Sequence, residues 1–455
     1  MSAGPAPGRH GRLAGMAAGP REQVERHTST WLTDRFNEGL ASLTPESLIY
    51  DERGQPARLT KEHFEHLVRK LKILRWLDRL PCESFLDVGA GTDHVPALVR
   101  ERRDADAYYA DLVHEVNLPR AGERLGKLDH AVTLDLRRLP FRDGAFDVVL
   151  ASEVLEHLVR PVEALAELVR VARRAVIMTS LEALAPDRMR RFLSHVAVDV
   201  RRPHVERNFF TVDEFHALLG PDLRHEALLS FPHAPVNPFW PRARIDATFA
   251  AIRDRASLEA ALVQAARSVP HGPGTMGILL VWTAPGVEVA PPRPAADASL
   301  ARWLVDEVVS LEYYAFALIC AEGVLRRRPE IGPRGPLLDR PVAPALLARL
   351  QCPDCRGRLA QAAGALCCAD CGARFSTEYG IPILHPTRAP DEAASHEEAV
   401  RRLCGADTGR AAAVRRLVTR LRRNEQPPGT WKRAAWRLET AMGSPLRRRG
   451  LWPPD

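Results

Sequence analysis

A glycine turn and the acids around it are the first residues in this chain whose spacing suggests chemistry. The segment 84–91, "SFLDVGAG", predicts a short buried strand that runs into a turn at Gly89 and Gly91 and then into a helix. Such turns present backbone N–H groups to the anionic or polar part of a nucleotide-like cofactor. A dinucleotide fingerprint requires a third glycine where His94 stands, and a methyl-donor turn requires it where Asp93 stands. The turn alone therefore leaves both cofactor classes open.

Two acids further along the chain narrow this choice. Asp111 follows the second predicted strand, where a carboxylate can accept from both ribose hydroxyls in either class of site. Asp135 ends the third predicted strand and opens the segment "DLRRLPFRDGAFDVVLASEVLEHL". This segment resembles the pattern of class I S-adenosylmethionine-dependent methyltransferases, and the resemblance extends over about residues 80–285.

The resemblance implies S-adenosylmethionine as the cofactor. It assigns cofactor-binding roles to Asp87, Gly89, Gly91, Asp93, Asp111, Asp135 and Leu136. The glycine turn would surround the methionine end, and Asp111 would hold the ribose. Asp135 would accept from the adenine amino group, and the backbone N–H of Leu136 would meet the ring. Asp93 departs from the family pattern and is expected to hydrogen-bond the cofactor's ammonium group.

The segment "SEVLEHL" supplies candidates for catalysis. Its E-x-x-E-H spacing, at Glu153, Glu156 and His157, resembles that of ubiquinone-pathway O-methyltransferases and small-RNA 2′-O-methyltransferases, which hold a divalent cation there. The alternative is that His157 caps the helix or shapes the pocket. Methyl transfer needs in-line alignment and, for a hydroxyl acceptor, removal of a proton. The candidate bases are His157, then Glu153, then His204, while a site that acts by shape alone also stays open.

A cysteine cluster indicates a metal site. Two C-x-x-C pairs in "CPDCRGRLAQAAGALCCADCGARF" place four thiolates at a spacing typical of structural zinc, with a redox pair or disulfide as the alternative. The predicted ligands are Cys352, Cys355, Cys368 and Cys371. Cys367 is the spare thiol. With the continuation "FSTEYGIPIL", residues 345–386 resemble the Trm112-type zinc ribbon, which implies a structural rather than a catalytic metal.

Strand and helix signals alternate around these residues, which predicts an α/β fold with a doubly wound sheet. The resemblance implies seven strands, of which residues 276–284 form the antiparallel one. The predicted organisation is a disordered leader (1–28), a methyltransferase domain (29–286), a linker and helix (287–344), the zinc ribbon (345–386) and a basic helical tail (387–455).

Composition limits where the protein works. The 455 residues contain no apolar run of membrane-spanning length and no signal-peptide core, so we expect a cytoplasmic protein without membrane insertion. The net charge of +7 resides in the tail from residue 386 onward. Cys82, Cys320 and Cys404 are scattered and are expected to be buried or inert thiols.

Three functions remain, in order of preference. The first is methylation of a small-molecule acceptor such as a metabolite or sugar, with the irregular segments 181–207 and 232–245 forming its pocket. The second is RNA methylation, in which the zinc ribbon and the basic tail hold phosphates. The third is a non-catalytic partner-binding protein. An apolar stripe within 410–424 predicts that the tail docks as a brace on another part of the molecule. The sequence does not fix the oligomeric state.

Overall fold

The computed structural model describes a set of ranges along the chain: 58–91, 95–112, 127–158, 160–180, 208, 210–230, 254–270, 275–293, 298–305, 340–388 and 391–425. Within these ranges, no helix combines the length and the apolar character that crossing a bilayer requires. The predicted leader 1–28 and the segments 181–207 and 232–245 lie outside the described residues.

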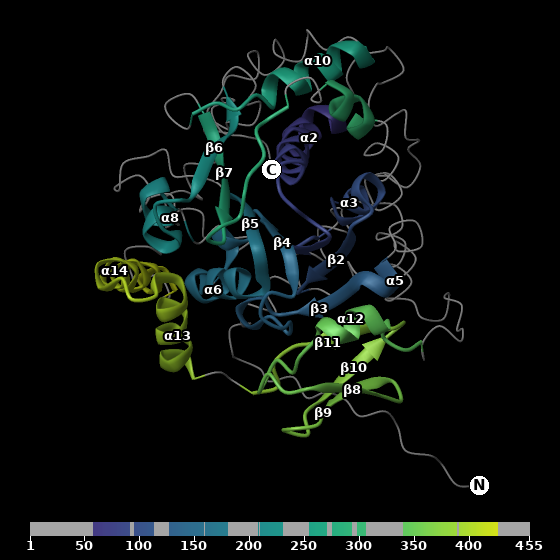
Figure 1. Ribbon diagram of the computed structural model, residues 1–455, viewed down its shortest axis with the longest axis vertical. Coiled ribbons are helices and arrows are strands. Elements are labelled where there is room, and N and C mark those ends of the chain that lie inside the picture. Colours follow the sequence, from purple (N-terminus) through teal and green to yellow (C-terminus); the bar gives the residue numbers. More distant parts are fainter. Residues whose placement is uncertain are drawn as a thin grey trace, which may run out of the picture.

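Eleven strands form one mixed sheet in the order β6-β7-β5-β4-β1-β2-β3-β11-β10-β9-β8 (Figure 1). Neighbouring strands are parallel from β5 through β4, β1, β2 and β3 to β11, while β7 is antiparallel to both β5 and β6. The strands are β1 (Ser84–Val88), β2 (Asp106–Asp111), β3 (Ala131–Leu134), β4 (Phe146–Ser152), β5 (Ala172–Ser180), β6 (Arg224–Ser230), β7 (Thr275–Thr283), β8 (Leu359–Ala362), β9 (Ala365–Cys368), β10 (Arg374–Glu378) and β11 (Ile381–Leu384).

Helices cover both faces of this sheet, as a doubly wound fold requires. One hydrophobic cluster joins the sheet to α2, α3 and α10, and the other joins its opposite face to α6, α8, α12, α13 and α14. The helices are α2 (Arg58–Leu77), α3 (Val95–Arg103), α5 (Lys127–His130), η5 (Leu136–Arg138), η6 (Leu155–His157), α6 (Pro161–Val171), α8 (Val212–Leu219), α10 (Arg255–Ala265), α12 (Pro344–Arg349), α13 (Glu392–Cys404) and α14 (Thr408–Glu425).

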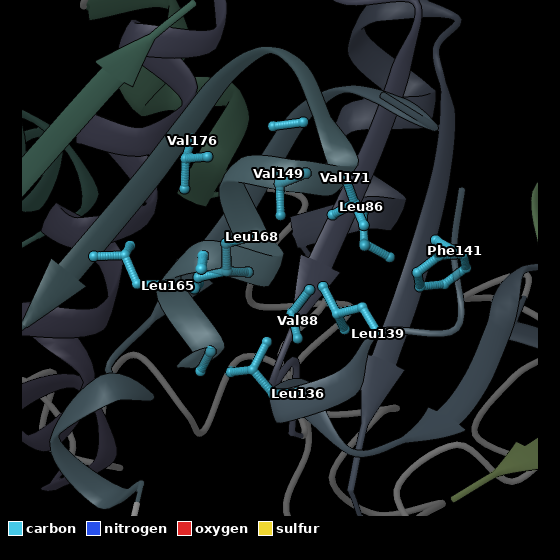
Figure 2. Close-up of a cluster of buried hydrophobic side chains, with 14 of the residues drawn as sticks. Leu86, Val88, Leu136, Leu139, Phe141, Val149, Leu165, Leu168, Val171 and Val176 are labelled. Atoms are coloured by element: carbon cyan, nitrogen blue, oxygen red, sulfur yellow. The ribbon is translucent and has the colours of Figure 1, made fainter. Parts of the chain in front are cut away.

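Helix α6 is buried on two sides, which explains its composition. Leu165 and Leu168 reach the sheet and join the cluster that contains Leu86 and Val149 (Figure 2). The opposite side carries charged residues, yet Glu167 and Arg170 are also buried there because α13 packs over them. A helix that is covered all round cannot keep a purely polar outer face, so its charges pair with each other.

The sheet has more strands than the seven that the resemblance implies. The seven strands β1–β7 are present, but β11 of the ribbon pairs in parallel with β3 and extends the sheet to eleven strands. The register places Ile383 opposite Thr133 and Leu384 opposite Leu134. The physical reason is that β3 would otherwise be an open edge with unpaired N–H and C=O groups, and β11 satisfies them.

The ribbon is also anchored at the other end of β2 and β3. Arg349 at the end of α12 pairs with Asp106 at 2.9 Å and lies over the Tyr108 ring. Burial opposes ionisation of Asp106, but hydrogen bonds from His130, Tyr108 and Arg349 outweigh it and hold the pKa of Asp106 well below its ordinary value. Residues 345–386 therefore belong to the same folded unit as strands β1–β7.

The predicted apolar stripe of the tail is buried, as expected for a brace. Val414, Leu417, Val418 and Leu421 are 0–6% exposed and belong to the same cluster as α8 and α13. The residues from 426 onward lie outside the described part of the chain.

Candidate functional site

The predicted cofactor residues lie at the carboxyl ends of adjacent parallel strands, where ligands bind in open α/β sheets. Asp87 is near the end of β1, Asp111 ends β2, and Asp135 directly follows β3. The Gly91 N–H donates to Asp111 Oδ2 at 2.7 Å, and the Gly89 N–H donates to the Ala110 carbonyl at 2.8 Å. The glycine turn is thus tied to the acid that was predicted to hold a ribose.

Both glycines of the turn are required by its geometry. Gly89 and Gly91 have φ angles of +75° and +52°, which favour glycine. A Cβ atom on Gly89 would lie 2.5 Å from Cγ2 of Val154, which follows β4, whereas one on Gly91 would meet no atom of the described residues within 4 Å. Gly89 therefore permits close packing against Val154, and Gly91 leaves open space beside the backbone where a cofactor could approach.

Asp135 is held in a way that the sequence did not reveal. Its side chain caps η5 by accepting from the Arg137 N–H, and the Arg137 guanidinium also donates to it, at 2.6 Å for the shortest contact. Although burial opposes ionisation, these contacts hold the pKa of Asp135 below its ordinary value. Leu136 is buried beside it. An adenine amino group would therefore meet a carboxylate that Arg137 already orients.

The structure separates the side chains of the predicted divalent-cation site. Glu153 has a φ of +53° and pairs through its carboxylate with Arg69 of α2 at 2.5 Å. Glu156 is buried and accepts from Ser180 Oγ at 3.5 Å. Among the described residues, the only group of three or more potential metal ligands that converges is the four-cysteine set. Glu153, Glu156 and His157 do not converge in this way, and the carboxylate of Glu153 pairs with Arg69 instead, so a cation at these three residues stays a prediction.

His157 remains a base candidate at the end of η6. It is half-buried, and its backbone N–H donates to the Val154 carbonyl at 3.1 Å. Asn208, which sequence reasoning missed, fixes this loop because its side chain donates to the carbonyls of Leu155 and Leu158 at 3.0 and 2.6 Å. The predicted residues Asp93 and His204 lie outside the described residues.

Four cysteines converge as predicted. The Sγ atoms of Cys352 and Cys371 are 3.7 Å apart, those of Cys355 and Cys368 are 3.4 Å apart, and all four lie within 4.8 Å of one another. A tetrahedral zinc with Zn–S bonds of about 2.3 Å separates its sulfurs by about 3.8 Å, so the set fits zinc. Cys367 lies on β9 outside this group.

The two C-x-x-C segments, Cys352–Cys355 and Cys368–Cys371, form two knuckles with the same backbone hydrogen bond and a left-handed residue after the second cysteine. The N–H of Arg356 donates to the Cys352 carbonyl at 2.8 Å, and that of Gly372 donates to the Cys368 carbonyl at 3.1 Å. Both residues have positive φ angles, +64° and +73°.

Outside the four-cysteine group, burial raises the pKa of the Cys82 thiol to about 12, which agrees with an inert side chain.

Comparison with known proteins agrees with this geometry. Residues 86–178 match a family model described as a methyltransferase domain. A search of curated proteins finds no match. The matched segment runs from β1 to β5 and so contains the glycine turn, Asp111 and Asp135.

Solved structures of low sequence identity are similar to this chain over part of its length. A complex of the Trm112 methyltransferase activator with a methyltransferase from Haloferax volcanii is 15% identical, covers 58% of this chain and 97% of that chain, and has a TM-score of 0.33. A protein named as a methyltransferase from Bacillus halodurans is 17% identical, with coverages of 47% and 97% and a TM-score of 0.31. Magnesium protoporphyrin IX methyltransferase from Synechocystis, with its cofactor bound, is 20% identical, with coverages of 38% and 80% and a TM-score of 0.27.

The sheet, the glycine turn and the domain match together define the class of protein. The chain carries an S-adenosylmethionine-dependent methyltransferase domain, as the sequence predicted.

Proposed function

We propose that the protein transfers the methyl group of S-adenosylmethionine to a small-molecule acceptor, at a hydroxyl group. The observation that carries the cofactor assignment is the link between Gly91 and Asp111 at the carboxyl ends of β1 and β2. In this proposal Asp111 binds the ribose, Asp135 and Leu136 bind the adenine, and the turn with Asp87 surrounds the methionine end. We also propose that Asp93 hydrogen-bonds the ammonium group of the cofactor.

The cofactor supplies a methyl group on a sulfonium, which is already an excellent leaving group. The protein must therefore align the acceptor and remove one proton. We assign the removal of this proton to His157, which would act as the general base, because Glu153 is already paired with Arg69. Glu153 then acts by orienting the loop after β4, and His204 stays a secondary candidate for the base.

The described part of the tail favours a small molecule over RNA. Arg415 pairs with Glu397 at 2.8 Å, and Arg420 pairs with Glu214 at 2.8 Å. Arg410 donates to the carbonyls of Leu218 and Leu403 at 2.9 Å each. These arginines hold α14 against α8 and α13, so their charges are largely paired within the protein and contribute little to binding phosphates.

We further propose that the four cysteines hold a structural zinc and that residues 345–386 form a Trm112-type ribbon. Four thiolates leave no open coordination position, so the metal would stabilise the ribbon and supply no catalysis. Clustered cysteines of this kind suit a reducing compartment, which supports a cytoplasmic location.

The acceptor can be tested with methyl-labelled S-adenosylmethionine. The purified protein is incubated with small-molecule and RNA fractions of a cell extract, with Asp111→Ala as the matched inactive control. We expect label in the small-molecule fraction, and its loss in the variant. Label in the RNA fraction alone would replace the proposed acceptor with RNA, and label in neither would refute the activity.

A further inference from the structure

A cavity of about 610 Å³ lies between the methyltransferase core, the ribbon and α13. It begins at Asp135 after β3 and continues along η5, the start of α6, the first cysteine knuckle, the segment after β11, and α13. Asp135 and His385 follow adjacent parallel strands, so the cavity extends the ligand-binding edge of the sheet. Six arginines line it: Arg137, Arg138, Arg160, Arg356, Arg388 and Arg402.

Among the described residues, four acids line the cavity with these six arginines, and two of the four are already neutralised. Arg170 binds both oxygens of Glu167 at 2.6 Å, and the Leu139 N–H donates to Glu167 Oε2 at 2.9 Å. Asp135 is paired with Arg137. A third acid, Glu163, lies 3.8 Å from His396. Of the arginines, Arg160 also has a partner, Glu392 of α13.

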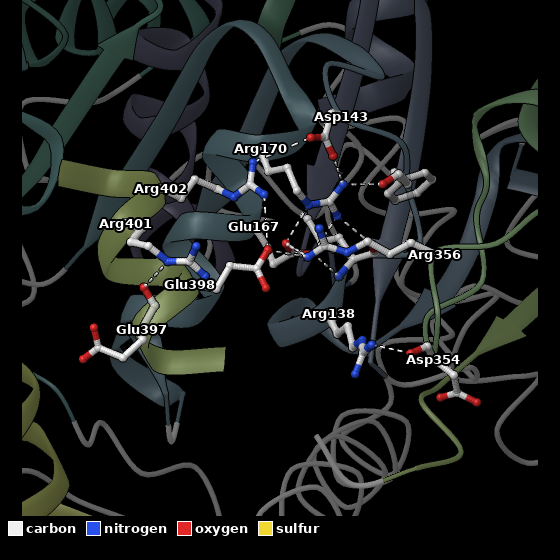
Figure 3. A network of polar contacts seen from close by, with 12 residues as sticks. Arg138, Asp143, Glu167, Arg170, Asp354, Arg356, Glu397, Glu398, Arg401 and Arg402 are labelled. Atoms are coloured by element: carbon white, nitrogen blue, oxygen red, sulfur yellow. Dashed lines mark hydrogen bonds and ion pairs between the residues drawn. The ribbon is translucent and has the colours of Figure 1, made fainter. Parts of the chain in front are cut away.

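The positive charge that is left is concentrated around Glu398. Arg356 and Arg402 each lie 3.3 Å from the same oxygen of Glu398, which is long for a charge-assisted hydrogen bond (Figure 3). Burial opposes ionisation of Glu398, yet the two arginines hold the pKa of this carboxyl below its ordinary value. Glu398 is thus shared by two guanidinium groups, and neighbouring acids add little to this pairing: Arg402 also lies 3.6 Å from Asp143 through Nη1, and Arg356 also lies 3.4 Å from Glu167.

These guanidinium groups retain donors. The contacts of Arg356 with described acids go through Nη2 alone, at 3.4 Å to Glu167 and 3.3 Å to Glu398, while a guanidinium carries five N–H donors. Arg356 has a φ of +64°, a conformation that is costly for a residue other than glycine, and its side chain lies in the cavity wall. Arg138 contacts the Asp354 carbonyl through Nη2, and it brings a further cation to the same wall.

We propose that this cavity binds phosphate groups. Planar guanidinium groups from three separate elements (η5, the cysteine knuckle and α13) can donate in pairs to tetrahedral phosphate oxygens, which recruits a multiply charged anion more strongly than a single carboxylate would. The source of the phosphate is either a small organic phosphate or a nucleic acid strand. The inference does not depend on which molecule accepts the methyl group.

The test uses neighbouring arginines of one helix. Pyrophosphate is titrated calorimetrically, at low ionic strength, into the full-length protein, Arg402→Gln and Arg401→Gln. Arg402 lines the cavity, whereas Arg401 is exposed and donates to the Glu397 carbonyl of its own helix. We expect Arg402→Gln to weaken binding by about tenfold, the size of one lost charge-assisted contact, and Arg401→Gln to bind as the wild type does.

A second variant and a second probe complete the test. Arg388→Gln removes an exposed arginine outside any helix and is expected to weaken pyrophosphate binding even if Arg402→Gln folds poorly. A short single-stranded RNA is titrated in parallel. Binding of RNA alone, weakened by the cavity variants, would identify a nucleic acid as the source, and binding of pyrophosphate would identify a small phosphate. Absence of binding to both probes, or equal losses in Arg401→Gln and the cavity variants, would overturn the proposal.

Discussion

Leu384 of β11 is the residue through which the unity of the ribbon and the sheet can be measured. Its side chain is fully buried, and its register partner is Leu134 on β3. Truncation to alanine removes buried apolar area and leaves a cavity, which together cost about 3 kcal/mol for a leucine in a core. The adjacent Ile383 is half-buried, so Ile383→Ala should cost only about 1 kcal/mol.

Urea denaturation followed by tryptophan fluorescence separates the two outcomes. None of the eight tryptophans lies within residues 345–386, so the signal reports unfolding outside the ribbon. If the ribbon and the sheet unfold as one unit, Leu384→Ala lowers the midpoint of this transition by about 1 M urea, given a slope of about 3 kcal/mol per molar. Ile383→Ala is the matched control and should shift it by about a third as much.

An unchanged fluorescence transition in Leu384→Ala would refute this reasoning, because the ribbon would then be an independent unit. Equal shifts for both variants would also contradict it, since the two side chains of β11 differ in burial.

The remaining predictions concern the metal, the tail and pH. Cys368→Ser should lose one equivalent of zinc in metal analysis while Cys367→Ser keeps it, and equal zinc contents would disprove the site. Leu417→Ser should lower thermal stability by about 2–4 kcal/mol, whereas its exposed neighbour Arg416→Gln should leave stability and turnover unchanged; the reverse pattern would mean that the tail serves to bind a ligand. Because the pKa of Asp106 is lowered by folding, its stabilisation is present above about pH 4 and is lost as the pH falls further, so an Asp106→Asn variant should show a flatter fall of the urea midpoint below pH 4 than the wild type.

Local patterns predicted most of the sheet and the metal ligands. Each strand from β1 to β7 is a short apolar run that an amphipathic or irregular segment separates from the next, so its type follows from nearby residues. The four cysteines are also local, since each knuckle spans four residues and Cys367 is excluded by register. The turn at Gly89 could be predicted because its positive φ angle is one that glycine adopts readily.

Pairings between segments that lie far apart in the chain could not be predicted from the sequence. The pattern of Ile381–Leu384 indicates a strand but not the edge that it joins, about 250 residues earlier in the chain at β3. Nothing near Glu153 indicates that Arg69 of α2 would take its carboxylate. The left-handed backbone at Arg356 could not be predicted either, because the residue is not a glycine. The place of its side chain in the arginine-lined cavity was therefore also missed.

The most direct test of the central claim is calorimetric titration of the full-length protein with S-adenosylmethionine. The geometry at the ends of β1 and β2 predicts binding at a stoichiometry near one to one, weakened at least about tenfold in Asp111→Ala because both the ribose contact and the tether to Gly91 are lost. Absence of heat with S-adenosylmethionine, together with binding of a nicotinamide dinucleotide, would contradict it.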